Sequence, residues 1–284
     1  MLPELPSFDL VVATVDRTEP LERLFDSLQR QTHSRFRVLL ADQNDDDRLE
    51  PIVAAHPALD VLHLRSDRGL SRARNRALPE TRADIVAFPD DDCVYGDDLL
   101  ERVASRLADD RSLQGLTGGA ADADGSSSPS WKTDAAELTR DNLWNRAISF
   151  TMFVRRELVT VVGRFDEQLG LGSGTPWSSG EEIDYLIRAL RAGARIEYDP
   201  SVVVEHHTAV HDGALGARDG ASVGYLLRKH GYPTQTLARM LVRPVGGVVT
   251  SLARGDRARA RFHAATLRGR VLGYRGARRP KSSA

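Results

Sequence analysis

Short apolar runs alternate with helix-patterned stretches along the first part of the chain. Runs rich in β-branched residues predict strands, and apolar residues spaced three or four positions apart predict helices that bury one face. The predicted strands cover residues 8–15, 35–41, 61–64 and 84–88, and the predicted helices cover 21–28, 49–55, 71–78 and 99–107. This alternation is typical of an α/β domain with a doubly wound, mostly parallel sheet and helices on both of its faces.

The pattern is less regular after residue 120. In chain order it predicts a loop over 121–133, a strand over 149–154, a helix over 179–192 and a strand over 196–205 with an interruption at Pro200. After His211 the pattern predicts helices to the end of the chain. Breaks are expected at 231–233 and 244–247, where proline and glycine interrupt the helical pattern.

Length and composition limit the classes of protein that this chain can represent. With 284 residues, of which 41% are apolar, the chain has enough material for a large core, which excludes general disorder. The single cysteine, Cys93, excludes an intramolecular disulfide and a cysteine-based metal cluster. No apolar run is long enough to span a bilayer, and the N-terminus lacks the features of a signal peptide. These observations predict a cytoplasmic protein.

The nearly even charge balance hides an uneven distribution of charge along the chain. From Thr236 to Ala284 there are twelve basic residues and one acidic residue, Asp256, so this segment carries +11 and the remainder carries −12. We therefore predict a folded domain over residues 1–212, with halves of about 1–120 and 121–212, followed by a basic helical C-terminal extension over 213–284. The extension is suited either to an anionic membrane leaflet or to packing as a solvated helix pair on the domain.

Polar clusters follow each of the first four predicted strands. The clusters contain Asp16 with Arg17, residues 42–44, residues 67–69, and residues 90–92. Because the carboxyl ends of parallel strands meet at one edge of the sheet, ligands of doubly wound domains bind there. The sequence therefore predicts a binding site at this edge.

Asp90, Asp91 and Asp92 form the most acidic of these clusters. Crowded carboxylates repel one another, and a hard divalent cation such as Mg²⁺ or Mn²⁺ relieves that repulsion. The cluster is therefore either a metal site or a solvated acidic turn before the next helix.

Three further acids, Glu181, Glu182 and Asp184, fall in the first turn of the predicted helix over 179–192. The apolar stripe of this helix predicts that Glu181 and Asp184 point away from the core, with Glu182 at the border. Acids at this position stabilise a helix through its dipole, and one of them is also a candidate general base.

The strand predicted over 196–205 leads into His206 and His207. Adjacent side chains of a strand point to opposite sides, so at most one of the two imidazoles faces a given site. The pair is either a surface feature or the source of a metal ligand.

A glycine turn at Gly69 precedes a helix start that carries Arg72, Arg74 and Arg76. A helix N-terminus with arginines suits a phosphate-bearing ligand, although a solvated helix face has a similar composition. The chain has no Gly-x-Gly-x-x-Gly after its first strand and no phosphate-binding Gly-Lys-Ser/Thr, which argues against dinucleotide and P-loop chemistry.

In this order the clusters resemble glycosyltransferase family 2, the inverting nucleotide-sugar transferases with a GT-A fold. The resemblance runs from about Leu10 to His207. Residues 11–17 are similar to the first strand and nucleotide-binding turn of the family, and residues 69–75 are similar to its donor-binding Gly-x-x-x-Ala-Arg-Asn segment. Residues 88–92 match its DxD motif, and residues 180–184 are similar to its Gly-Glu-Asp-x-Asp/Glu segment.

The resemblance implies roles for individual residues. Binding of the nucleotide sugar is assigned to Thr14, Asp16, Arg17, Asp42, Gly69, Arg74, Asn75, Asp90 and Asp91, with Asp42 contacting the base. It also implies a divalent metal, Mn²⁺ or Mg²⁺, held by Asp90, Asp92 and His206, with His207 as the less favoured histidine. The catalytic base corresponds to Glu182. The family usually has the shorter Asp there, so Glu181 and Asp184 stay as alternatives.

The expected function is metal-dependent, inverting transfer of a sugar from a nucleotide-diphosphate sugar to a hydroxyl of a saccharide or lipid-linked acceptor. The resemblance places this activity in polysaccharide synthesis at the cell surface or cell wall, with the enzyme in the cytoplasm or peripheral to the cytoplasmic face of the membrane, and nucleic acid is not expected as a partner. Two alternatives are a nucleotidyltransferase that forms sugar nucleotides and a non-catalytic carbohydrate- or nucleotide-binding module. The chain lacks the glycine-rich signature loop of the first, whereas the glutamate at the base position keeps the second open.

Overall fold

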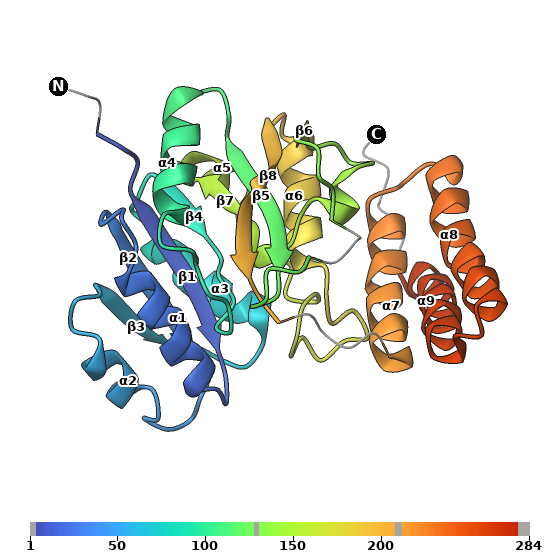
Figure 1. Ribbon diagram of the computed structural model, residues 1–284, viewed down its shortest axis with the longest axis horizontal. Coiled ribbons are helices and arrows are strands. Elements are labelled where there is room, and N and C mark those ends of the chain that lie inside the picture. The colour runs from blue at the N-terminus through green and yellow to red at the C-terminus, as the bar shows by residue number, and fades with distance from the viewer. Residues whose placement is uncertain (1–3, 128–130, 208–211, 278–284) are drawn as a thin grey trace. The chain divides into compact units, whose positions relative to one another are not determined.

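The computed structural model describes residues 4–127, 131–207 and 212–277 (Figure 1). Compact packing divides the chain into two units: Met1–Phe165 with Tyr185–Thr208, and Asp166–Asp184 with Ala209–Ala284. The expected boundary near residue 212 precedes the C-terminal helices, but the segment Asp166–Asp184 groups with those helices. Part of the loop predicted over 121–133 lies outside the described residues, as do the last seven residues of the predicted extension.

The first unit is built on an eight-stranded sheet with the order β3-β2-β1-β4-β7-β5-β8-β6 (Figure 1). The strands are β1 (Phe8–Thr14), β2 (Phe36–Asp42), β3 (Val61–Arg65), β4 (Ile85–Ala87), β5 (Gly115–Ala121), β6 (Ala136–Glu137), β7 (Phe153–Arg155) and β8 (Ile196–Glu205). The first four strands are parallel, β7 is antiparallel to both of its neighbours, and β8 is parallel to β5. The prediction of a doubly wound, mostly parallel sheet is confirmed.

Helices cover both faces of this sheet, because successive side chains of each buried strand point to opposite sides. The helices are α1 (Glu19–Gln29), α2 (Glu50–Ala55), α3 (Leu70–Ala77), α4 (Leu99–Asp109), α5 (Arg156–Val162) and α6 (Glu181–Arg191). On one face, Leu10 and Val12 of β1 share a core with apolar residues of α1, α2 and α4. Outside that core, α3 contacts β1 and β2, and α5 contacts β4 and β7. Helix α6 is divided, since Glu181–Asp184 belong to the second unit.

Strands β5, β6 and β7 differ from the sequence-based expectation. The pattern missed the two-residue β6, and it missed β5, whose sequence Gly-Leu-Thr-Gly-Gly-Ala-Ala is poor in β-branched residues. Gly118 of β5 is required by close packing, since a Cβ built there would lie 2.0 Å from the carbonyl oxygen of Val202. The strand predicted over 149–154 is wrong in its first half, where Ser149–Thr151 form a 3₁₀ turn before β7.

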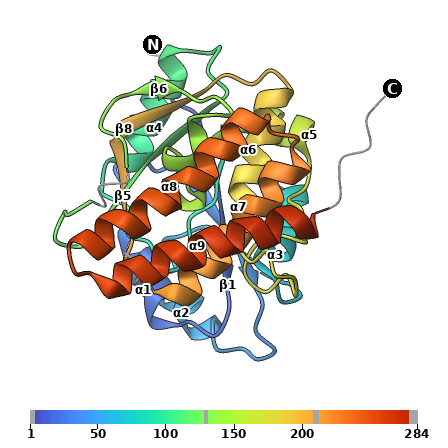
Figure 2. The same cartoon turned by 90° about the vertical axis from the view of Figure 1, so that its right-hand side faces the viewer.

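The second unit contains α7 (Gly213–Lys229), α8 (Thr234–Ala253) and α9 (Arg257–Gly276). Figure 2 shows α8 and α9 side by side on the same side of α7. Glycines let α7 and α9 approach so closely that their backbones touch: a Cβ at Gly220 would lie 2.4 Å from the carbonyl oxygen of Thr266. None of the described helices is long and apolar enough to cross a membrane.

The helix break predicted at 244–247 is wrong, because α8 continues through Pro244. A proline inside a helix leaves the carbonyl of the residue four positions earlier without its usual N–H partner. Here that carbonyl belongs to Met240, and the guanidinium of Arg270 on α9 donates a hydrogen bond to it. Burial, with the nearby charge of Arg243, lowers the pKa of Arg270 to about 10. A tertiary contact thus replaces the helical bond that proline removes.

Candidate functional site

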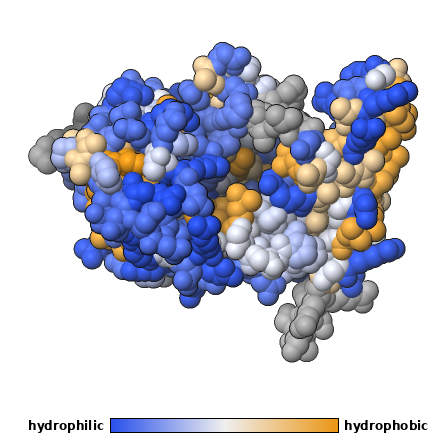
Figure 3. Space-filling model, turned by 90° about the horizontal axis from the view of Figure 1, so that it is seen from below, coloured by the Kyte–Doolittle hydropathy of each residue, from blue (hydrophilic) through white to orange (hydrophobic). Residues whose placement is uncertain are grey.

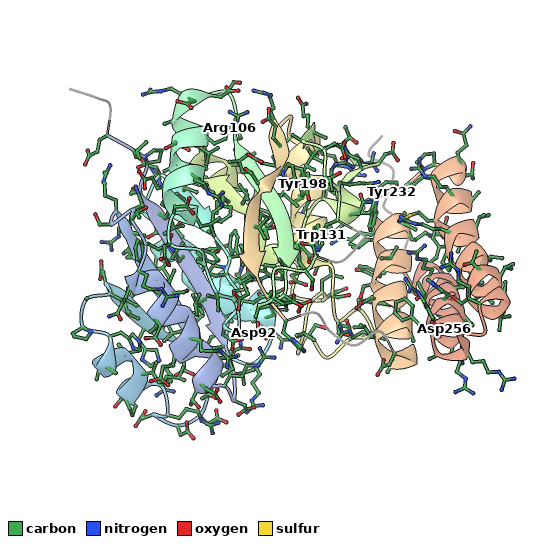
Figure 4. The ribbon with its side chains drawn as sticks, in the orientation of Figure 1. Asp92, Arg106, Trp131, Tyr198, Tyr232 and Asp256 are labelled. Atoms are coloured by element: carbon green, nitrogen blue, oxygen red, sulfur yellow. The ribbon has the colours of Figure 1, made fainter. Side chains whose placement is uncertain are left out.

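The predicted site residues of the first unit lie at the carboxyl ends of its strands, where Figure 4 shows Asp92. Asp90 is bridged to Ala13 at the end of β1, and Val94 is bridged to Glu205 at the end of β8. These two bridges bring the aspartate turn beside His206, although more than a hundred residues separate them in the sequence.

Asp92 and His206 form the centre of this site. His206 Nε2 lies 3.1 Å from Asp92 Oδ1, and the imidazole stacks on Phe150 with ring centroids 4.4 Å apart. Burial acts to raise the pKa of Asp92, but the hydrogen bond and charge of His206, together with Arg17, lower it to about 2. Burial acts to lower the pKa of His206, but the bond to Asp92 outweighs it and raises that pKa. His207 is 89% exposed in its side chain, so the geometry favours His206 as the ligand candidate.

Asp91 is held by two groups from the end of β1. Thr14 Oγ1 donates a 2.6 Å hydrogen bond to Asp91 Oδ2, and Arg17 donates to Asp91 Oδ1 at 2.8 Å. The same nitrogen of Arg17 lies 2.6 Å from Asp92 Oδ2, so one guanidinium bridges two neighbouring carboxylates. Burial raises the pKa of Asp91 despite these partners. Arg17 is half-exposed, which limits what this pair contributes to stability.

Asp90 turns toward Arg74, whose side chain is only 1% exposed. Arg74 donates a 3.0 Å hydrogen bond to Asp90, and its guanidinium lies within 6 Å of the ring centroids of Phe88 and Phe165. Asn75 exchanges two hydrogen bonds with the backbone of Phe165. Both were predicted to bind the donor; in this structure Arg74 positions the aspartate turn, and Asn75 holds the backbone at Phe165. Each of the three aspartates has a cationic partner within the chain.

Two amide side chains in the turn after β2 link this turn to the turns after β1 and β3. Gln43 accepts a hydrogen bond from the backbone N–H of Gly69, whose φ of 130° requires glycine. Asn44 accepts one from the backbone N–H of Asp16, and Asp16 is the one non-glycine residue among those described with a positive φ, 57°. Strained backbone of this kind is concentrated at functional sites. The sequence pattern did not single out Gln43 or Asn44 for this role.

Asp42, predicted to contact the base, is completely buried. One of its oxygens accepts hydrogen bonds from the backbone N–H and side-chain amide of Asn44, and the other from His63 and Arg65. These four bonds use the acceptor positions that a carboxylate offers. Asp42 therefore anchors the turn after β2, and a direct contact between its carboxylate and a ligand would require one of these partners to leave.

The acids at the start of α6 belong to the second unit. The prediction that Glu181 and Asp184 point away from the core is wrong, since both are buried. For Asp184 the reason is the end of α7: Lys229 Nζ lies 2.5 Å and His230 Nε2 2.8 Å from Asp184 Oδ1. The apolar stripe of α6 indicated one packed face, but it gave no sign of the second packed face, which contains Asp184. Glu182 is half-buried, so it is the most accessible of the three acids.

The donor atoms at Asp92 and His206 suit a divalent metal ion. Among the described residues, Asp92, Cys93 and His206 offer ligand atoms within 4.8 Å of one another. Burial raises the pKa of the Cys93 thiol well above its usual value, which leaves a neutral thiol that a hard cation does not prefer. A carboxylate and an imidazole are compatible with a divalent ion such as Mn²⁺, which makes Asp92 and His206 the ligand candidates. Asp90 is not in this cluster, because Arg74 holds it.

A doubly wound sheet with an aspartate turn and a histidine at its carboxyl edge defines the GT-A fold class. The chain belongs to glycosyl transferase family 2, since the model of that family matches residues 9–160. The prediction made from the sequence is confirmed.

Several curated proteins are similar to this chain. The pre-mycofactocin glycosyltransferase of Mycobacterium tuberculosis is 26% identical over 236 residues, which cover 78% of this chain and 47% of that protein. The chain thus spans about half the length of that relative. The succinoglycan biosynthesis protein ExoM of Rhizobium meliloti is 25% identical, over 84% of this chain and 77% of its own length.

Solved structures support the fold at lower sequence identity. The mannosyltransferase PcManGT of Pyrobaculum calidifontis, in complex with GDP-Man and Mn²⁺, aligns with a TM-score of 0.65 and 16% identity, covering 95% of this chain and 87% of that one. S. aureus TarS 1-349 in complex with UDP-GlcNAc aligns with a TM-score of 0.62 and 17% identity, covering 92% and 90%.

Proposed function

We propose that this protein is a metal-dependent inverting glycosyltransferase. It transfers a sugar from a nucleotide-diphosphate sugar to a hydroxyl of a saccharide or lipid-linked acceptor. The observation that carries the proposal is the contact between Asp92 and His206 at the carboxyl edge of the sheet, in a chain of glycosyl transferase family 2. The complexes of PcManGT with GDP-Man and Mn²⁺ and of TarS with UDP-GlcNAc support a nucleotide-sugar donor. The name of ExoM supports a role in polysaccharide synthesis.

Each site residue has a proposed role in the transfer of the sugar. A bound divalent ion supplies positive charge that stabilises the departing nucleoside diphosphate. Asp92 and His206 would hold the ion, and Arg17, which is half-exposed beside them, would supply a second positive charge for the diphosphate. Arg74 keeps the aspartate turn in place. Glu182 accepts the proton of the acceptor hydroxyl as that oxygen attacks the anomeric carbon, which inverts the configuration there.

The location of the enzyme follows from the acceptor. We place it in the cytoplasm, in peripheral contact with an anionic membrane leaflet through its basic C-terminal segment, where a lipid-linked acceptor would be found. The described helices include no candidate membrane span, which is compatible with peripheral contact.

Replacing His206 with alanine is expected to weaken Mn²⁺ binding at least about tenfold, because one of two ligands is lost. Replacing His207 with alanine is the matched control and should leave Mn²⁺ affinity unchanged, since its side chain is exposed. Isothermal titration with Mn²⁺ in the presence of a nucleoside diphosphate measures both. Equal losses in the two variants would contradict the assignment of His206.

Replacing Glu182 with glutamine is expected to lower transfer by about 10²–10⁴-fold, because the general base is removed. Nucleotide binding, measured as a thermal shift with nucleoside diphosphates and Mn²⁺, should be retained. The transfer rates of Glu181→Gln and Asp184→Asn test whether one of the other two acids is the general base instead. Asp184→Asn breaks the contacts with Lys229 and His230, so its expected result is a lower melting temperature.

The products of donor turnover separate the proposed function from its alternatives. A glycosyltransferase releases a free nucleoside diphosphate, whereas a nucleotidyltransferase that forms sugar nucleotides exchanges pyrophosphate. A non-catalytic module binds nucleotide without turnover with any acceptor. Pyrophosphate release from a nucleoside triphosphate and a sugar phosphate would overturn the proposed function.

A further inference from the structure

The outward side of α8 carries a continuous apolar face. Four of its side chains are large, aliphatic and exposed: Val242 at 65%, Val245 at 45%, Val249 at 62% and Leu252 at 57%. Their spacing of three, four and three residues places them along one side of the helix. Single exposed apolar residues are ordinary on proteins, but a row along one helix indicates a binding surface.

This face is not the side by which α8 packs within its own unit. The buried residues of α8 are Thr236, Met240, Pro244 and Ser251, and they form a separate stripe. Gly247 on the same stripe lies against the ring of His263 on α9. The helix therefore has two separate faces. Helix α9 covers the buried one, and the apolar row lies on the other.

Positive charge is concentrated on α8 and on its neighbour α9. Helix α8 contains no acidic residue, and it carries the exposed Arg239 and Arg243. The neighbouring α9 exposes Arg257, Arg261, Arg268 and Arg275, which recur at spacings that place them on one side of that helix. In Figure 3 the helical unit, at the right of the picture, shows a hydrophobic strip bordered by hydrophilic residues.

An anionic bilayer matches both features at once. Aliphatic side chains of an interfacial helix enter the boundary between headgroups and acyl chains, and arginines remain at the level of the phosphates. A surface that gathers positive charge with almost no acid is complementary to anionic lipid.

We propose that Val242, Val245, Val249 and Leu252 of α8 form a membrane-insertion face, and that the exposed arginines of α8 and α9 attract the helical unit to anionic lipid headgroups. The inference deepens the proposed function, because it names the surface by which the enzyme would meet a lipid-linked acceptor. It does not depend on catalysis, since lipid binding can be measured without donor or acceptor.

The full chain with a fluorophore on α8 tests the insertion directly. Cys93 is buried, so a cysteine introduced by Val249→Cys is the one that an environment-sensitive thiol label reaches. The label should shift to the blue when vesicles of phosphatidylcholine with a third of phosphatidylglycerol are added, and not with pure phosphatidylcholine. Val161→Cys on α5, which is 66% exposed, is the matched control and should show no shift. A shift at Val161 and none at Val249 would overturn the proposal.

Co-sedimentation with the same vesicles tests which residues contribute to binding. The double variant Val245→Ser and Val249→Ser should bind at least about tenfold more weakly, because buried aliphatic surface is lost. Arg261→Gln with Arg268→Gln should weaken binding to anionic vesicles only, and added salt should do the same to the unaltered protein. Unchanged binding in both double variants would overturn the proposal.

Light scattering without lipid tests whether a second copy of the chain covers the apolar face of α8 instead. A dimer that the valine double variant converts to a monomer would overturn the membrane assignment. The thermal shift with nucleoside diphosphate and Mn²⁺ should be the same in all these variants. Vesicle binding without donor turnover would reject the proposed function and leave this inference standing. Donor turnover without vesicle binding would reject this inference and leave the proposed function standing.

Discussion

Replacing Asp92 with asparagine is expected to lower kcat/KM for sugar transfer by at least about 10²–10³-fold, the scale observed when a group that stabilises charge in the transition state is removed. The carboxylate contacts His206 at 3.1 Å and Arg17 at 2.6 Å, so it holds both of these side chains in the site. Asparagine has the same shape but no charge, and only one of its two terminal atoms can accept a hydrogen bond.

The measurement is a Mn²⁺ titration of initial rates, together with Mn²⁺ affinity by isothermal titration. The apparent affinity for Mn²⁺ should fall with kcat, because the same side chain is assigned to hold the ion. Asp97→Asn is a matched control, since Asp97 is exposed and pairs with Arg30 outside the site. Full activity of Asp92→Asn at ordinary Mn²⁺ concentrations would reject the metal-ligand role.

The same substitution has a separate effect on folding that must not be mistaken for the catalytic one. The pKa of Asp92 falls from 3.8 to about 2 in the folded protein, so its charged form stabilises the fold at neutral pH. That stabilisation is lost as the pH falls through about 2. The Asp92→Asn variant should therefore have a somewhat lower melting temperature than the unaltered protein at neutral pH. The transfer rates of the two proteins must be compared at a temperature well below both melting temperatures.

The parallel half of the fold could be predicted from the sequence because its periodicity is a local property. Apolar β-branched runs become buried strands, and one-sided helices such as α1 cover them. The polar cluster after each strand was correctly expected at one edge of the sheet, since parallel topology alone brings the carboxyl ends together.

The details of the site could not be predicted, because they depend on contacts between distant segments. The choice between His206 and His207 is made by the bridge between Val94 and Glu205, which no local pattern encodes. The burial of Asp184 depends on Lys229 and His230, which lie far along the chain on α7 and at its end. The continuation of α8 through proline depends on Arg270 of another helix. In each case the residue itself could be identified in the sequence, but its role in the fold depends on a contact with a distant segment.

Replacing Gly273 with alanine is expected to destabilise the helical unit by about 1–3 kcal/mol or more, because there is no room for a methyl group between α7 and α9. A Cβ built at Gly273 would lie 1.9 Å from the carbonyl oxygen of Ala221 and 2.9 Å from the backbone nitrogen of Tyr225. Both of these atoms belong to backbone, which cannot rotate away as a side chain does. The two helices must therefore move apart over several turns, where Gly220, Gly224 and Gly269 now hold them in contact.

Gly246→Ala on α8 is the matched control for this substitution. It has the same chemistry in a helix of the same unit, but no atom lies within 4 Å of the added Cβ. Alanine should stabilise that helix by about 0.5–1 kcal/mol, because glycine loses more backbone entropy on folding. Amide hydrogen exchange of α7 and α9 measures both effects locally, which matters in a chain of two units that need not unfold together. Faster exchange in Gly273→Ala and equal or slower exchange in Gly246→Ala is the expected result, whereas equal protection in the two variants would show that α7 and α9 do not depend on their glycine contact.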